Sequence, residues 1–104
     1  MASLADVDKH RVTAVLVSHN GAVWLPEVVA ALTSQTRPID LITAVDTGSE
    51  DASTKLLKSA RISFFTTDRE TGFGQAVSLA VDKLPQSVDH EWIWLIHDDC
   101  APAP

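Results

Sequence analysis

Residues 12–17 read Val-Thr-Ala-Val-Leu-Val, and residues 18–21, which follow directly, read Ser-His-Asn-Gly. The first run is apolar and β-branched, which predicts a strand buried on both faces, and the second predicts a loop. The same succession of an apolar run and a polar segment recurs at residues 41–45 and at residues 92–96. Strands that are apolar on both faces are typical of parallel sheets covered by helices.

The segments between these runs predict helices and one further strand. Apolar residues recur at helical spacing over residues 25–35 and 72–84, and a shorter, polar helix is predicted over residues 52–59. Residues 62–66 are β-branched and aromatic, which predicts a third strand in chain order. Strands that alternate with helices predict an α/β fold, a Rossmann-like three-layer sandwich around a mostly parallel sheet of about four strands.

The composition fits one small domain. Of the 104 residues, 45% are hydrophobic and 21% are charged, which suits a single core. We therefore treat residues 1–104 as one domain. Residues 1–10 and the Pro-Ala-Pro end at residues 102–104 are expected to be disordered, because they lack a periodic apolar pattern.

Charge and hydropathy exclude several classes of function. Fourteen acidic and eight basic residues give a net charge of −6, which excludes the positive surface that sequence-independent nucleic-acid binding requires. The sequence has no run near the ~20 apolar residues that span a bilayer. Cys100 is the single cysteine and cannot form an internal disulfide. These features together favour a cytoplasmic protein.

Asp98 and Asp99 form an acidic pair directly after the last apolar run. Two adjacent carboxylates repel one another unless a cation or solvent compensates them. Magnesium and manganese prefer such oxygen ligands and complete their coordination with water and phosphate oxygens, so the pair predicts a metal site shared with a diphosphate. The alternative is a solvated strand end in which one aspartate caps the next turn.

A second polar segment follows residues 41–45. Asp46 ends the predicted strand, and Gly48 permits a tight turn before Asp51. Ser49 and Asp51 are good N-cap residues for the helix that follows, and we assign them that role. Asp46 is not needed as a cap, so its carboxylate is a candidate to accept a hydrogen bond from a base or a ribose.

The residues around the acidic pair do not form a zinc site. His97 and Cys100 flank the pair without a second ligand cluster, so His97 is expected to partner the carboxylates and Cys100 to be a small buried residue. Trp24, Trp92 and Trp94 are bulky enough to be expected in the core.

The glycines do not form a dinucleotide cradle. Gly21 stands alone in the first loop, and the Gly72-Phe73-Gly74 segment lacks a third glycine because Val77 occupies that position. The pattern argues against a dehydrogenase and predicts a turn that enters a helix.

In their order, these segments resemble the N-terminal half of a family 2 glycosyltransferase with the GT-A fold. The resemblance covers residues 12–102 and rests on five short motifs in order: Val15 to Asn20, Gln35 to Pro38, Val45 to Asp51, Gly72 to Ala76 and Leu95 to Asp99. The chain departs from the family at His97, where many members have aspartate, and at Ser18 and His19, where Thr-Tyr is commoner. It also ends where the family's acceptor-binding half would begin, which predicts a truncated GT-A domain.

The resemblance implies a nucleoside-diphosphate-sugar donor and a divalent metal, Mn²⁺ or Mg²⁺. It implies a metal site at Asp99, with Asp98 contacting metal or ribose, and a loop before Gly72 that borders the diphosphate. The substrate-binding residues implied in this chain are Ser18, His19, Asn20, Asp46, Gly48, Gly72 and Asp98. The sugar would pass with inversion to an acceptor hydroxyl of a glycan or lipid, in a full-length enzyme that associates with a membrane.

No residue of the chain is a candidate for the general base, so the 104 residues alone are expected to transfer no sugar and to form a homodimer through exposed sheet. Two other classes of function compete with this interpretation. A receiver-type signalling domain would carry its acidic pair after the first strand, where this chain has Ser18 and His19. A non-catalytic α/β binding or assembly module would leave the acidic strand ends as solvated surface.

Overall fold

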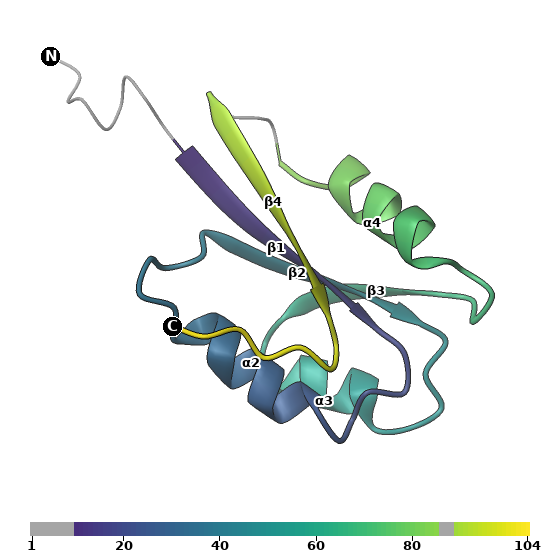
Figure 1. Ribbon diagram of the computed structural model, residues 1–104. Helices are drawn as coiled ribbons and strands as arrows, with labels where there is room; N and C mark the ends of the chain where they lie inside the picture. Colours follow the sequence, from purple (N-terminus) through teal and green to yellow (C-terminus); the bar gives the residue numbers. More distant parts are fainter. Residues whose placement is uncertain (1–9, 86–88) are drawn as a thin grey trace, which may run out of the picture.

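The computed structural model describes residues 10–85 and 89–104, which form one sheet of four parallel strands and three helices. The elements in chain order are β1 (His10–Ser18), α2 (Leu25–Thr33), β2 (Leu41–Thr47), α3 (Ser53–Ser59), β3 (Ser63–Thr67), α4 (Phe73–Asp82) and β4 (His90–His97). The strand order is β3-β2-β1-β4. Helices α2 and α3 cover one face of the sheet and α4 covers the other (Figure 1). The predicted α/β fold is therefore confirmed.

Strand β1 is central in the sheet because its side chains are apolar on both faces. Ala14 and Leu16 point toward α2 and α3, whereas Val15 and Val17 point toward α4. All four side chains are buried, as the continuous apolar run predicts. Two cores, one on each face, hold the three layers together.

The helices are shorter than the sequence predicts. Helix α2 ends at Thr33, two residues before the predicted end, and its last carbonyls accept hydrogen bonds from the Thr33 and Ser34 hydroxyls. Such back-bonding offers these carbonyls partners outside the helical ladder. Helix α4 begins at Phe73 and ends at Asp82, ahead of Pro85.

Among the described residues, strand β4 lies at an edge of the sheet and pairs with β1. Trp92 on this strand is 57% exposed, and Trp24 before α2 is 48% exposed, so the expected burial of these two side chains is wrong. Trp94 packs against the core on the α2 and α3 side, as expected. Cys100 is exposed rather than buried, because it follows β4 in a turn closed by its amide and the His97 carbonyl.

The two ends of the chain bear on the predicted disorder. Residues 1–9 lie outside the described residues, and His10, which was predicted to be disordered with them, is the first residue of β1. The predicted disorder of residues 102–104 is wrong. The Ala103 and Pro104 carbonyls accept hydrogen bonds from the Gln35 side chain and the Thr36 amide, just beyond α2.

Candidate functional site

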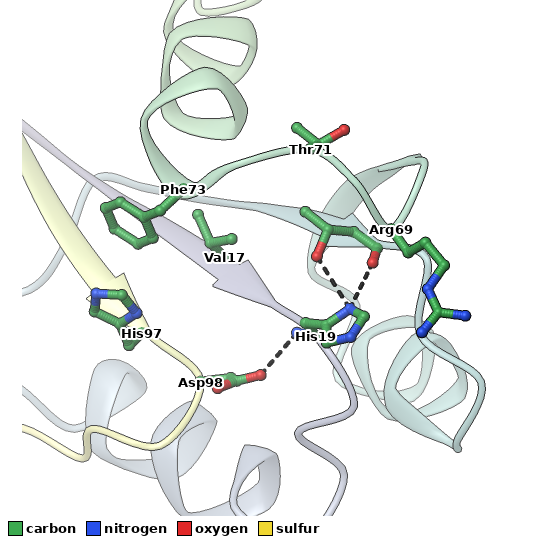
Figure 2. Close-up of a pocket in the computed structure, with 8 residues that line it drawn as sticks. Val17, His19, Arg69, Thr71, Phe73, His97 and Asp98 are labelled. Carbon is green, nitrogen blue, oxygen red and sulfur yellow. Dashed lines mark hydrogen bonds between the residues drawn. The ribbon is translucent and has the colours of Figure 1, made fainter.

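A pocket of about 290 Å³ lies at the carboxyl ends of the strands, on the face that α4 covers. In an open parallel sheet this edge is where ligands bind, since the loops there vary freely and helix N-termini point toward it. Its lining combines apolar, basic, acidic and hydroxyl side chains: Val17, His19, Thr47, Arg69, Thr71, Phe73, His97 and Asp98 (Figure 2). The loops after three strands and the first residue of α4 therefore meet here.

Strand alternation decides which polar residues enter the pocket. Val17, His19 and Thr47 line it, so Ser18 and Asp46, one residue out of phase, point toward α2 and α3. Ser18 is fully buried and Asp46 is 1% exposed. Neither side chain lines the pocket, and their predicted nucleotide contacts stay predictions. Thr47 occupies the position at the end of β2 that the sequence analysis gave to Asp46.

The Asp46 carboxylate is already engaged by its own loop. Its Oδ2 accepts a hydrogen bond from the Ser49 amide (2.9 Å), and its Oδ1 accepts one from the Ser49 hydroxyl (2.5 Å). Ser49 is thus held by Asp46 and is not the helix cap that the sequence predicts. Asp51 is not the N-cap residue either, because Ala52 occupies that position. The Asp51 Oδ1 nevertheless accepts hydrogen bonds from the amide and hydroxyl of Ser53, the first residue of α3. The bond from the Ser53 hydroxyl is the main cause of a lowered pKa for Asp51.

His19 is held in one orientation between two strands (Figure 2). Its Nδ1 lies 2.6 Å from the Thr47 carbonyl oxygen, and a carbonyl can only accept, so Nδ1 carries the proton. Its Nε2 then accepts a hydrogen bond from the side-chain Nδ2 of Asn20 at 3.4 Å. The imidazole therefore enters the pocket with a defined tautomer and a fixed ring plane.

Asn20 ties the loop after β1 to the loop after β2. Its backbone is left-handed (φ 51°), a conformation that asparagine tolerates better than most residues. The backbone N–H of Asn20 donates to the Ser49 hydroxyl oxygen (2.8 Å), and the side-chain Oδ1 of Asn20 accepts from the backbone N–H of Glu50 (2.7 Å). Asn20 therefore shapes the rim of the pocket instead of lining it, and its predicted substrate contact stays a prediction.

Asp98 is the carboxylate that lines the pocket. Its Oδ2 accepts a hydrogen bond from the His19 amide (2.8 Å). Burial, together with the neighbouring Asp99 charge, raises the pKa of Asp98, while the His19 amide and the nearby imidazoles oppose that rise. Asp99 is exposed and lies beside the pocket without lining it.

Gly21 is required by the close approach of Asp98 to the first loop. A Cβ atom at Gly21 would lie 2.3 Å from the Asp98 Oδ2, far inside contact distance. The absence of a side chain thus makes room for the carboxylate on which the predicted metal site depends. The local sequence predicts a loop at Gly21 but does not indicate this packing role.

The raised pKa of Asp98 predicts a stability cost at neutral pH. Folding disfavours ionisation of this carboxyl, so the ionised side chain destabilises the folded state above its pKa. We expect the Asp98→Asn variant, which retains an acceptor for the His19 amide, to unfold at a higher urea concentration than the wild type at pH 7. The difference should shrink as the pH falls through 3.8, the ordinary value, because Asp98 then becomes protonated in the unfolded state as well as in the folded state.

Urea titrations of both proteins between about pH 3 and pH 8 check this expectation. These limits extend about one pH unit or more to either side of the ordinary aspartate pKa. Asp82→Asn, at the exposed end of α4, is the matched control for removal of a negative charge. A lower midpoint for Asp98→Asn than for the wild type at pH 7 would contradict the argument.

His97 and Phe73 form an aromatic pair on the α4 side of the pocket. Their rings stack with centroids 4.1 Å apart and planes 18° apart. His97 was expected to partner the carboxylates. It acts on Asp98 only through its charge, because its ring is placed against Phe73. Phe73 belongs to the predicted helical pattern of residues 72–84, packs against the core on the α4 side and also lines the pocket, a role that the pattern does not indicate.

Gly72 and Gly48 lie in the loop before α4 and the loop after β2, outside the set of residues that line the pocket. Gly72 is the N-cap residue of α4 and has open space around it, outside the set of lining residues. Gly48 is left-handed (φ 68°), and a Cβ there would lie 2.8 Å from the Arg69 amide nitrogen. It therefore supports the loop that carries Arg69, and a direct substrate contact by either glycine stays a prediction.

Within residues 10–85 and 89–104, no group of three or more His, Cys, Asp or Glu side chains could hold a metal ion by itself. Asp98 and Asp99 stay a predicted metal site. Burial of Asp98, together with the Asp99 charge, raises the pKa of Asp98, and a divalent ion beside the two carboxylates would favour the ionised form. In many sites the protein supplies one or two carboxylate ligands to such an ion, and substrate phosphates complete its coordination.

An open parallel sheet with helices on both faces and a pocket at the carboxyl ends of its strands places the domain in the α/β class, in which ligands bind at this edge. The chain belongs to glycosyl transferase family 2, whose model matches residues 13–104. A search of curated proteins found no match. The described residues contain no helix with the length and apolar character needed to cross a membrane.

The fold is also similar to that of glucosyl-3-phosphoglycerate synthase from Mycobacterium tuberculosis, a GT-A enzyme solved in complex with Mn²⁺, uridine diphosphate and glucosyl-3-phosphoglycerate. The TM-score is 0.70 at 14% sequence identity, which shows a shared fold. The match covers 91% of this chain and 36% of that enzyme's chain. The predicted GT-A architecture is thereby confirmed.

Proposed function

We propose that this domain binds the nucleoside-diphosphate-sugar donor of a glycosyltransferase in the pocket at the carboxyl ends of β1, β2 and β4. The observation that carries the proposal is Asp98, which the His19 amide holds at the pocket beside a second carboxylate. Family membership and the uridine diphosphate bound by the M. tuberculosis enzyme support a donor of this class.

Asp98 and Asp99 would hold the divalent ion, Mn²⁺ or Mg²⁺. When bound, such an ion supplies positive charge that stabilises a departing diphosphate. The chain's own contribution is orientation, since the His19 amide fixes one Asp98 oxygen and leaves the other for a ligand. His19 itself presents a fixed imidazole to the pocket, suited to contact a base or a ribose.

In the proposed reaction an acceptor hydroxyl, of a glycan or a lipid, displaces the nucleoside diphosphate at the anomeric carbon with inversion. A general base must lie within reach of that hydroxyl. We assign none of the described residues this role, so the 104 residues are proposed to bind donor without transferring sugar. A cytoplasmic location and a homodimer through the exposed β4 edge are further parts of the proposal, the second favoured by exposed Trp92 and Leu95.

Calorimetric titration tests the donor site directly. Uridine, guanosine and thymidine diphosphates are titrated into the wild type and into Asp99→Ala, each with and without Mn²⁺. We expect manganese to strengthen binding of the preferred nucleotide and the Asp99→Ala variant to lose about tenfold or more in affinity, because the ion loses a carboxylate ligand.

Asp82→Ala, which removes an exposed carboxylate of α4, should bind as the wild type does. Folded wild-type protein that binds none of the three nucleotides would sink the proposal. That result would favour a non-catalytic binding or assembly module with solvated carboxylates at its strand ends.

A further inference from the structure

Arg69 is the described residue of the pocket lining that carries a permanent positive charge. It lies in the loop between β3 and α4, which a compact turn holds in place. The Asp68 carboxylate accepts hydrogen bonds from the Glu70 amide (3.0 Å) and the Thr71 hydroxyl (3.3 Å), and the Asp68 carbonyl accepts one from the Thr71 amide (3.1 Å). The backbone under Arg69 is therefore fixed, whereas its side chain is 65% exposed.

The Arg69 guanidinium forms an ion pair with Glu50, which joins the loop after β3 to the loop after β2. Nη1 of Arg69 lies 3.6 Å from Oε1 of Glu50, and the two side chains are 65% and 78% exposed. An ion pair this long and this exposed to solvent contributes little, about 1 kcal/mol or less. A ligand with a denser negative charge can therefore take the guanidinium from Glu50.

The backbone of Glu50 is held close to the opposite side of the pocket. Its amide donates to the Asn20 Oδ1 at 2.7 Å, and Asn20 in turn faces His19. Glu50 is thus anchored to the loop after β1, and its carboxylate is presented to Arg69 from the loop after β2. The pair therefore connects the loops after β1, β2 and β3.

We propose that Arg69 binds the diphosphate of the donor and that Glu50 holds its guanidinium in the absence of nucleotide, an inference that rests on the proposed function. A guanidinium pairs with phosphate oxygens through two parallel hydrogen bonds, which are stronger than a single long contact to a carboxylate. The diphosphate would then lie between Arg69 and Asp98, the residue that would hold the divalent ion. Glu50 competes with the diphosphate and lowers the affinity of the pocket for it.

The test compares uridine diphosphate with uridine, which lacks phosphate, in the presence of Mn²⁺. Arg69→Gln should weaken binding of uridine diphosphate about tenfold and leave uridine unchanged. Glu50→Gln should strengthen binding of uridine diphosphate about two- to fivefold, again without an effect on uridine. The double variant should bind as Arg69→Gln does, because Glu50 acts through Arg69.

Lys55→Gln and Glu27→Gln, at exposed positions of α3 and α2, match the two charge changes away from the pocket and should change neither affinity. If the wild type binds uridine diphosphate and Arg69→Gln binds it equally well, this inference is wrong and the donor site stands. If Glu50→Gln strengthens binding equally with and without Arg69, the competition is wrong. If the folded wild type binds no nucleotide, the proposed function fails first.

Discussion

Replacing Leu16 with alanine is expected to lower the free energy of unfolding by about 2–5 kcal/mol, which is a large part of the stability of a small domain. Leu16 is fully buried at the centre of β1 and belongs to the core between the sheet and helices α2 and α3. In the sheet it lies between Ala44 of β2 and Ile96 of β4. Truncation leaves a cavity that small neighbours such as Ala44 cannot fill.

Urea denaturation followed by tryptophan fluorescence measures this loss, with a lower midpoint and an unchanged slope as the signature. Leu79→Ala on α4 is the matched control, because the same atoms are removed from a side chain that is 36% exposed. Its cost should stay near about 1 kcal/mol or below. Equal costs for the two variants would show that the sheet face under α2 and α3 is not the principal core.

The order and type of the elements could be predicted because each strand and helix carries its own local pattern. The runs at residues 12–17 and 41–45 are too apolar to lie anywhere but in a buried sheet. The same argument placed the polar residues at one edge, since the carboxyl ends of parallel strands meet there. The location of the pocket was therefore predictable from the chain.

The orientation of the site residues could not be predicted for the same physical reason. A strand that is apolar on both faces carries no alternation, so its sequence does not tell which face Asp46 or Thr47 occupies. The family resemblance favoured Asp46, and the structure buries that carboxylate against Ser49. Tertiary packing against α2 and α3 decides which face of the sheet each of these side chains points toward, and the local sequence does not reveal that choice.

Arg69 and Trp92 show two further limits of the sequence. Residues 67–71 are polar and aperiodic, so nothing local distinguishes Arg69 from any solvated cation. Its position at the pocket depends on contact with Gly48, which is distant in sequence. Trp92 was expected in the core because its side chain is bulky. The local sequence does not reveal strand order, and β4 lies at an edge of the sheet, where Trp92 is exposed.

Gly48→Ala is expected to destabilise the domain by about 2 kcal/mol or more and to weaken binding of uridine diphosphate toward the level of Arg69→Gln. Gly48 has a left-handed backbone (φ 68°), which costs an alanine about 1–2 kcal/mol. The added Cβ would also lie 2.8 Å from the Arg69 amide nitrogen and 3.1 Å from the Arg69 Cα. These are backbone atoms, so the loop that presents Arg69 must move.

Gly74→Ala provides the control, because a Cβ at this position in α4 meets nothing within 4 Å. Alanine is preferred over glycine inside helices, so this variant should be as stable as the wild type or more stable by about 1 kcal/mol. Binding of uridine and of uridine diphosphate, measured on folded protein, separates the two effects of Gly48→Ala. Gly48→Ala could lose stability and still bind uridine diphosphate more tightly than uridine by the same factor as the wild type. That result would show that Arg69 does not depend on Gly48, because the guanidinium would still reach the phosphates from a displaced backbone.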